Sequence, residues 1–218
     1  MLDRDRIRAN LNKYTRKAFE ILPKLENPSI LDIGCGTGVP TIELAKLSRG
    51  EIVAIDISRE SLNRLERNAE REGLAHKIDT VYLSASELEE LNRHFDIVWA
   101  EGVIAAIGFE KGLREWRSLV KPGGFLVIHD DYTDTESKLD LIPQCGYRLL
   151  DRFILSWETW WTEHYRPLEE ELNGLESGGP DDSLKSEIAA ARSEIEKFRT
   201  EYGSNSSIFF IMQRVDSI

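Results

Sequence analysis

The segment with the clearest chemical content is Leu31–Gly38, LDIGCGTG, in which three glycines alternate with other residues after a hydrophobic run and an aspartate. Glycines that follow a strand let a ligand approach the backbone closely. The dinucleotide fingerprint has the spacing G-x-G-x-x-G, but Val39 stands where its third glycine would be. A phosphate-binding P-loop would end in Gly-Lys-Ser or Gly-Lys-Thr, whereas Val39 and Pro40 follow Gly38. Both spacings argue against a phosphate loop, so an NAD-dependent dehydrogenase is the weakest alternative.

Two aspartates near this loop favour a different ligand. Asp32 precedes the glycines, and an unpaired carboxylate there would repel a pyrophosphate but attract a cation. Asp56 ends the next hydrophobic run, VAID, where a carboxylate suits the two hydroxyls of a ribose. S-adenosylmethionine has a sulfonium, an ammonium, a ribose and no phosphate. The two aspartates together suit this cofactor, although Asp56 alone is equally compatible with NAD.

Hydrophobic runs that alternate with amphipathic stretches must position these residues. The runs predict buried strands at 29–33, 51–56, 78–83, 95–100, 124–129, 147–155 and 207–215. Apolar periodicity and capping residues predict helices at 7–22, 40–49, 58–73, 109–120 and 135–144. Strands alternating with helices indicate a doubly wound α/β fold with a mostly parallel sheet. The first helix is expected to pack across the mouth of the sheet.

The alternation stops after the sixth strand, where residues 156–206 predict a helical insertion before the last strand. This insertion comprises an aromatic-rich helix at 156–176, a turn-rich linker at 177–182 and a charged helix at 183–202. We expect it to be a lid or an oligomer contact. Its aromatic residues Trp157, Trp160 and Trp161 are expected to anchor it to the rest of the chain.

The chain is expected to form one domain over 1–218, with residues 1–28 as an N-terminal helical cap. Either a monomer or a homodimer fits this organisation. The charged helix at 183–202 would be a dimer contact or, as we favour, a solvated outer face.

The loop LDIGCGTG resembles the signature of the class I S-adenosylmethionine-dependent methyltransferases. The resemblance covers roughly residues 13–155 and the final strand. It implies a seven-stranded sheet of order 3-2-1-4-5-7-6 in which the seventh strand is antiparallel. It also implies S-adenosyl-L-methionine as the cofactor and S-adenosyl-L-homocysteine as the product.

The same resemblance assigns cofactor contacts to the loop and to the end of the second strand. The methionine part of the cofactor would be contacted or oriented by Asp32, Gly34, Cys35 and Gly36. Asp56 would bind the ribose hydroxyls, and Ile57 would pack on the adenine.

Two later segments extend the resemblance. Many family members have Asp-Ala-x-x-Leu after the third strand, and here SASEL has Ser84 at the aspartate position and Ala85 after it. The Ser84 hydroxyl or the Ala85 amide is therefore expected near the adenine. The segment EGVI, which begins at Glu101, resembles a subgroup that methylates small molecules, in which Glu101 would lie near the sulfonium or the amino group. The alternative for Glu101 is a helix-capping or exposed carboxylate.

Four residues are candidates for catalysis, namely Glu101, His129, His164 and Tyr165. His129 follows the fifth strand, on the carboxyl side of the sheet where ligands of open α/β folds bind. His164 and Tyr165 lie in WETWWTEHY, a region that helps to close the acceptor pocket in the same subgroup. A hydroxyl acceptor would need a base, whereas a neutral amine would not. Asp130 and Asp131 are the nearest approach to a metal pair, and no metal site is expected.

The composition of the chain limits which partners, metal sites and cellular locations are expected. The chain has 28 basic and 39 acidic residues and a net charge of −11, which disfavours nucleic acid as a partner. Two cysteines and four scattered histidines indicate neither a disulfide framework nor a structural zinc site. No apolar run approaches the roughly 20 residues that span a bilayer, and the beginning has no apolar signal core. A cytoplasmic location without membrane contact is therefore expected.

The leading hypothesis is an enzyme that methylates a small-molecule acceptor. One alternative is a regulatory or scaffold protein that binds the cofactor and has lost turnover. Another is a protein or RNA methyltransferase. The acidic net charge disfavours this last class, as does AEGV in place of an NPPY-type tetrapeptide after the fourth strand.

Overall fold

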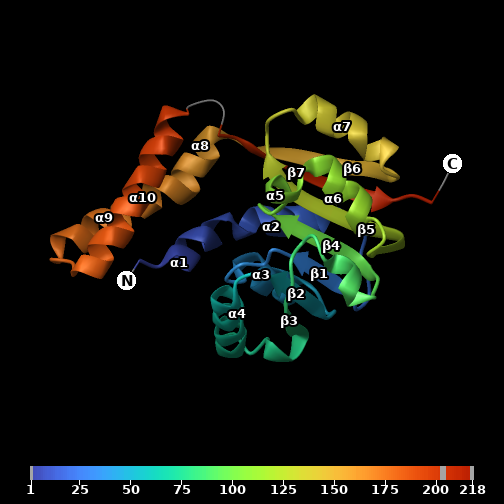
Figure 1. The fold of residues 1–218 in the computed structure, drawn as a ribbon, viewed down its shortest axis with the longest axis horizontal. Helices are drawn as coiled ribbons and strands as arrows, with labels where there is room; N and C mark the ends of the chain where they lie inside the picture. The colour runs from blue at the N-terminus through green and yellow to red at the C-terminus, as the bar shows by residue number, and fades with distance from the viewer. Residues whose placement is uncertain (1, 202–204, 217–218) are drawn as a thin grey trace.

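The computed structural model describes residues 2–201 and 205–216, and a seven-stranded sheet runs through this part of the chain (Figure 1). The strands are β1 (Ile30–Ile33), β2 (Ile52–Asp56), β3 (Ile78–Tyr82), β4 (Phe95–Glu101), β5 (Val120–Asp131), β6 (Tyr147–Leu155) and β7 (Ser207–Arg214). Their order is β3-β2-β1-β4-β5-β7-β6, and β7 is antiparallel to both of its neighbours. The predicted fold class and strand order are confirmed.

Helices flank the sheet and extend beyond it. They are α1 (Arg4–Arg8), α2 (Asn12–Ile21), α3 (Val39–Leu47), α4 (Arg59–Arg71), α5 (Ile104–Ile107), α6 (Phe109–Trp116), α7 (Thr135–Gln144), α8 (Trp157–Trp160), α9 (Arg166–Ser177) and α10 (Asp182–Thr200). A π-helical stretch, Trp161–Tyr165, joins α8 to α9. Short 3-10 turns lie at Ala9–Leu11, Ala75–Lys77 and Leu88–Leu91. No helix in the described ranges is both long and apolar enough to cross a membrane.

Strands β1 and β2 are buried on both faces because they are apolar at nearly every position. On one face, Ile30 of β1 packs in a cluster with Ala18 of α2 and Leu44 of α3. On the other face, Leu31 packs with Leu113 of α6. Successive strand residues point to opposite faces, so the side chain at every second position faces α2 and α3.

The helix predicted over 7–22 is divided into α1, a 3-10 turn and α2. A continuous α-helix would direct Ile7 and Leu11 to the same side, because they are four residues apart. The tighter turn sends them to different places: Leu11 joins the sheet cluster, whereas Ile7 packs with α9 and α10. The prediction of one helix was wrong because it assumed a single apolar face.

Another predicted boundary was also wrong, since the helix expected over 109–120 ends at Trp116. Val120 is the first residue of β5, and it pairs with Phe95 of β4. Strand pairing thus overrides helical periodicity at the end of this segment. The charged helix predicted over 183–202 corresponds to α10, and the predicted residue Tyr202 lies outside the described residues.

Helices α9 and α10 lie side by side away from the sheet, and α1 leads from them toward it (Figure 1). These elements share a hydrophobic group, here called the outer cluster, which consists of Leu2, Ile7, Leu168, Leu172, Ile188, Ala191 and Ile195. The N-terminal segment and the insertion, far apart in sequence, therefore form one packed unit beside the sheet.

Candidate active site

The glycine loop connects β1 to α3, and its three glycines serve different purposes. All have positive φ angles, 69° at Gly34, 55° at Gly36 and 84° at Gly38. A Cβ added at Gly34 would lie 2.7 Å from Val103 Cβ, and one at Gly38 would lie 2.1 Å from Leu65 Cδ1. Nothing lies within 4 Å of a Cβ added at Gly36. Gly34 and Gly38 thus permit close packing, whereas Gly36 leaves space open for a ligand.

A cavity of about 200 Å³, here called the loop cavity, lies against this loop. Its lining consists of Arg8, Asp32, Gly34, Cys35, Gly36, Thr37, Val39, Pro40 and Glu101. The structure therefore brings together all the residues predicted for the methionine part of the cofactor, including Glu101. Burial raises the pKa of the Cys35 thiol, so this side chain is a neutral wall of the cavity.

Asp32 is 2% exposed and accepts a hydrogen bond of 2.6 Å from the Thr41 hydroxyl. Burial raises its pKa to about 7, and the nearby carboxylates Glu101 and Asp56 add to the rise. A cation bound beside Asp32 would favour its ionised form. The charge of Asp32 therefore depends on what lies beside it.

Asp56 connects the glycine loop to the start of α4. Its Oδ2 accepts a 2.8 Å hydrogen bond from the Gly36 amide, and its Oδ1 accepts one of 2.8 Å from the Ser58 amide. The neighbouring Ile57 is 68% exposed, which leaves an apolar surface at the end of β2. Neither residue is in the lining of the loop cavity.

The residues predicted to meet the adenine follow β3 and also lie outside that lining. The Ser84 hydroxyl is 2.8 Å from the Ser86 hydroxyl. The Ala85 carbonyl accepts a 3.3 Å hydrogen bond from Trp116 Nε1. The Ser84 hydroxyl and the Ala85 amide both remain predictions as adenine contacts.

Glu101 ends β4 and faces the same side of the sheet as Trp99, two residues earlier. Its Oε1 accepts hydrogen bonds from Trp99 Nε1 at 2.9 Å and from the Thr15 hydroxyl at 2.8 Å. Its Oε2 lies 2.5 Å from Arg8 Nη2, and the side chain is 5% exposed. Glu101 is therefore a buried and firmly oriented carboxylate, not an exposed or helix-capping one.

Strand register brings His129 beside Glu101. Glu101 pairs with His129 across β4 and β5, and His129 pairs with Phe209 across β5 and β7. His129 Nδ1 is 4.0 Å from Glu101 Oε2, and His129 Nε2 is 2.7 Å from the Ser207 hydroxyl. The imidazole stacks on the Phe209 ring at 4.1 Å. Burial lowers the pKa of His129 to about 4, so the imidazole is neutral at pH 7.

A second cavity, of about 320 Å³, lies beside this row and is here called the aromatic cavity. Its aromatic walls are Trp160, Tyr165 and Phe198, and it also reaches His129 and Ser207. The Tyr165 and Phe198 rings stack at 3.8 Å, and Trp160 Nε1 donates a 2.8 Å hydrogen bond to the Ser207 hydroxyl. Arg8 and Glu101 line both cavities, so the two meet there.

The other residues predicted in the insertion have different surroundings. His164 is not in the lining of the aromatic cavity; its ring meets those of Trp160 and Tyr165 edge-on, and burial lowers its pKa to about 4. Burial also raises the pKa of Tyr165 to about 12. Trp157 stacks on Trp161 and Phe198, which both lie within the insertion. The expected anchor to the rest of the chain is Trp160, which packs against the sheet cluster and also lines the cavity.

Lys138 pairs with both of the aspartates that follow His129. Its Nζ lies 2.7 Å from Asp130 Oδ2 and 3.1 Å from Asp131 Oδ1. The Lys138 ammonium therefore occupies the position between the two carboxylates that a bound metal ion would take. Within residues 2–201 and 205–216, no group of three or more potential ligands is suited to a metal ion.

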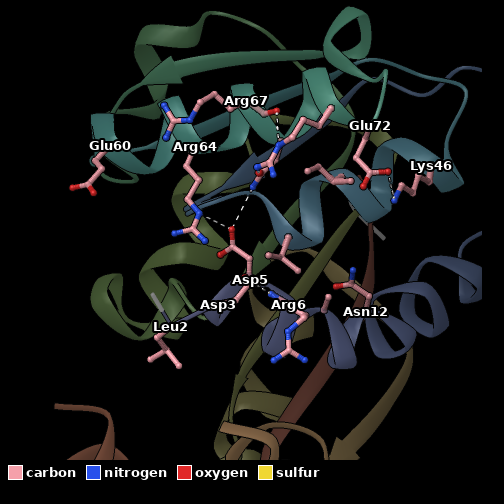
Figure 2. A pocket seen from close by; sticks show the side chains of 15 residues that line it. Leu2, Asp3, Asp5, Arg6, Asn12, Lys46, Glu60, Arg64, Arg67 and Glu72 are labelled. Carbon is pink, nitrogen blue, oxygen red and sulfur yellow. Dashed lines mark hydrogen bonds and ion pairs between the residues drawn. The ribbon is translucent and has the colours of Figure 1, made fainter. Parts of the chain in front are cut away.

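A larger cleft of about 840 Å³ separates α1 from α3 and α4 (Figure 2). Asp5 projects into it and pairs with Arg64 Nε at 2.7 Å. The other Asp5 oxygen accepts a 2.7 Å hydrogen bond from the Thr37 hydroxyl of the glycine loop. These contacts fasten α1 to the loop.

Sequence reasoning missed Arg8 and Thr15 as site residues. They are seven residues apart in a segment that was expected to cross the mouth of the sheet. In one continuous helix this spacing would put both residues on one face, but the 3-10 turn Ala9–Leu11 separates them, so the spacing alone did not place them at the site. Ser207 was missed because it lies at the start of a strand that reads as purely apolar.

Comparisons with known proteins agree with this geometry. Residues 30–124 match the family model described as a methyltransferase domain. The sterol 24-C-methyltransferase erg6 of Aspergillus fumigatus is 32% identical over 106 residues, which are 48% of this chain and 28% of that protein. The ribosomal protein L11 methyltransferase of Geobacter sp. strain M21 is 37% identical over 114 residues, which are 52% of this chain and 35% of that protein. The chain spans less than half the length of these curated relatives.

A solved structure extends the similarity to nearly the whole chain. The S-adenosylmethionine-dependent methyltransferase of Geobacter sulfurreducens, solved with S-adenosyl-L-homocysteine, superposes with a TM-score of 0.75. It covers 98% of this chain and 100% of the other at 16% identity, which is evidence for a common fold. Residues 30–124 are thus similar to a methyltransferase domain, and they lie in a sheet with the strand order of the class I methyltransferase fold.

Proposed function

We propose that this chain transfers a methyl group from S-adenosylmethionine to a small-molecule acceptor. The observation that carries the proposal is the meeting of two cavities at Arg8 and Glu101. One is lined by a glycine loop and buried carboxylates, and the other has aromatic walls. The cofactor, when bound, supplies an electrophilic methyl group on a positively charged sulfur.

The residues of the loop cavity fit the methionine end of this cofactor. Gly36 leaves room where any side chain would project, and Asp32 and Glu101 offer carboxylates to its cationic groups. Asp56 keeps its place at the end of β2, where we assign it to the ribose hydroxyls. The exposed Ile57 is our assignment for the adenine.

The aromatic cavity is our assignment for the acceptor. Its volume is at the lower end of small-molecule sites, which run from about 300 to 1,000 Å³. Aromatic walls of Trp160, Tyr165 and Phe198 would exclude water and hold an apolar or cationic acceptor against the methyl group. Because positive charge on sulfur disappears during methyl transfer, orientation and water exclusion would supply much of the rate enhancement.

A proton path for hydroxyl acceptors begins at Ser207. Its oxygen accepts from Trp160 Nε1 and lies beside His129 Nε2, so it can pass an acceptor's proton to the neutral imidazole. Glu101, near Nδ1, would then stabilise the charged ring. An amine acceptor would not need this path.

Turnover of S-adenosylmethionine across a panel of amines, phenols, alcohols and carboxylates tests the proposal. We expect S-adenosylhomocysteine to form with at least one class. His129→Phe, which keeps the stack on Phe209, should lower kcat for a hydroxyl acceptor by roughly 100-fold or more and leave cofactor affinity unchanged. Cofactor binding without turnover of any acceptor would instead favour a regulatory or scaffold protein.

A second candidate function is protein methylation, because the L11 methyltransferase relative acts on a protein. Two observations weigh against it here: the net charge of −11 and the position of α8 and α10 beside the aromatic cavity. Methylation of a protein substrate at a rate above that of every small molecule would reverse this preference.

A further inference from the structure

Arg8 is a site residue with unused hydrogen-bonding capacity. Its Nη2 pairs with Glu101, but its Nη1 is buried and has no hydrogen-bond partner among the described residues. A guanidinium presents donors in a planar fork that matches the two oxygens of a carboxylate. Buried donors are nearly always paired in the working state of a protein, so Nη1 points to a missing acceptor.

The charges around the loop cavity indicate which acceptor this is. The cavity has the carboxylates Asp32 and Glu101 and the guanidinium of Arg8 in its lining. A ligand with only positive charge would meet the carboxylates and be repelled by Arg8. A zwitterion has an ammonium and a carboxylate on one carbon. Its ammonium can pair with the carboxylates of the lining, and its carboxylate can pair with Arg8.

We propose that Arg8 binds the carboxylate at the amino-acid end of S-adenosylmethionine while Asp32 and Glu101 face the ammonium. The inference rests on the proposed function, which supplies the ligand. It makes α1 a part of the cofactor site. Within the cavity lining, the glycine loop and the sheet provide only negative charges, and α1 provides the positive one.

Asp5 positions Arg8 for this task. The two residues are three apart on α1 and therefore share a face of the helix. Asp5 pairs with Arg64 (Figure 2) and accepts a hydrogen bond from Thr37, so the face that carries Arg8 is fixed against the glycine loop. The orientation of the guanidinium is thereby set before a ligand arrives.

Calorimetric titration with two ligands that differ by one group tests the proposal. S-adenosylmethionine has the carboxylate, and decarboxylated S-adenosylmethionine lacks it but keeps the ammonium and the sulfonium. Arg8→Met should weaken binding of the first roughly 10- to 100-fold. It should leave binding of the second unchanged or tighter, because a repelling cation has been removed. Arg8→Lys should recover part of the affinity for the first ligand.

Arg4→Met is the matched control, since Arg4 lies on the same helix and pairs with Glu194 of α10. We expect this variant to discriminate between the two ligands as the natural chain does. Equal weakening of both ligands in Arg8→Met, or no change in either, would overturn the assignment of Arg8. If the natural chain binds neither ligand, the proposed function itself fails, and that outcome is distinct from a failure of Arg8 alone.

Discussion

Glu101 joins three separate parts of the chain through its two oxygens: Trp99 of β4, Thr15 of α2 and Arg8 of α1. Three donors fix the orientation of this carboxylate, so a ligand must bind to it in that orientation. The site is thus organised before binding, which lowers the conformational entropy that the protein itself loses when a ligand binds.

The ionisation of Asp32 makes cofactor affinity depend on pH. A cationic ligand needs the ionised form, and the pKa of Asp32 is about 7 in the ligand-free protein. We therefore expect S-adenosylmethionine to bind about tenfold more weakly at pH 6 than at pH 8. His129 and His164 have pKa values of about 4 and do not titrate in this window. Calorimetry at both pH values checks this, and Asp32→Asn should abolish the difference.

The same shift affects stability in the opposite direction. The folded-state pKa of Asp32 is raised above its ordinary value of 3.8, so the folded protein binds the proton more tightly than the unfolded chain. Between about pH 4 and pH 7, this residue should make the free energy of unfolding decrease as pH rises. Urea denaturation should find a shallower decrease in Asp32→Asn, and an unchanged pH dependence would contradict the assigned pKa.

Two alanine substitutions in the glycine loop should separate binding from folding. Gly36→Ala puts a methyl group into the loop cavity at a φ of 55°, and we expect a stability loss of about 1 kcal/mol but more than tenfold weaker cofactor binding. Gly38→Ala drives a Cβ against the buried Leu65, and we expect a loss of about 2–4 kcal/mol. Denaturation and calorimetry on both variants check this; similar losses of stability would refute the distinction.

The residues of the glycine loop could be predicted from sequence because their conformation is local. Three alternating glycines after a strand define a tight turn without reference to the rest of the fold. Arg8 and Thr15 could not be assigned this way, because their approach to Glu101 depends on how α1 and α2 cross the sheet. Ser207 reaches His129 only through the antiparallel register of β7, which no local pattern specifies.

At the scale of elements, strands were predicted more accurately than helix ends. The inner strands β1 and β2 are short apolar runs, and burial on both faces leaves little ambiguity. Helix ends depend on neighbours: the helix expected to continue to residue 120 gives way where Val120 pairs with Phe95. The turn between α1 and α2 likewise depends on Ile7 and Leu11 having separate clusters to join.

The anchoring of α1 by Asp5 can be tested by hydrogen exchange. In Asp5→Asn the pairing with Arg64 is weakened, and we expect the amides of residues 6–11 to exchange several-fold faster while those of β4 are unchanged. Addition of S-adenosylmethionine should slow the same amides in the natural chain. If neither the substitution nor the ligand changes the exchange rates of the α1 amides, this helix is not part of the site.

At the scale of the whole molecule, α1 and the 3-10 turn after it link two hydrophobic groups. The outer cluster contains Ile7 of α1 together with residues of α9 and α10, whereas Leu11 of the turn belongs to a cluster on the sheet. Phe198 of α10 also lines the aromatic cavity. We therefore propose that the N-terminal segment and the insertion act together as a lid over both cavities.

Leu172→Ala tests this unit, because Leu172 is fully buried in the outer cluster. The cavity left behind should cost about 2–4 kcal/mol locally. We expect faster hydrogen exchange in α1, α9 and α10 and weaker binding of S-adenosylmethionine, with β4 and β5 still protected. Leu44→Ala, in the sheet cluster, is the control and should lower the protection of the strands. Uniform loss of protection in both variants would mean that the outer cluster does not open separately.

The most direct test of the account is a calorimetric titration of the natural chain with S-adenosylmethionine, with NAD as the comparison ligand. The glycine spacing, the buried Asp32 and the zwitterion-compatible loop cavity predict saturable binding of one S-adenosylmethionine per chain at micromolar concentrations, roughly the range of enzyme substrates. They predict no measurable binding of NAD. Absence of heat with S-adenosylmethionine, or tighter binding of NAD, would contradict the account.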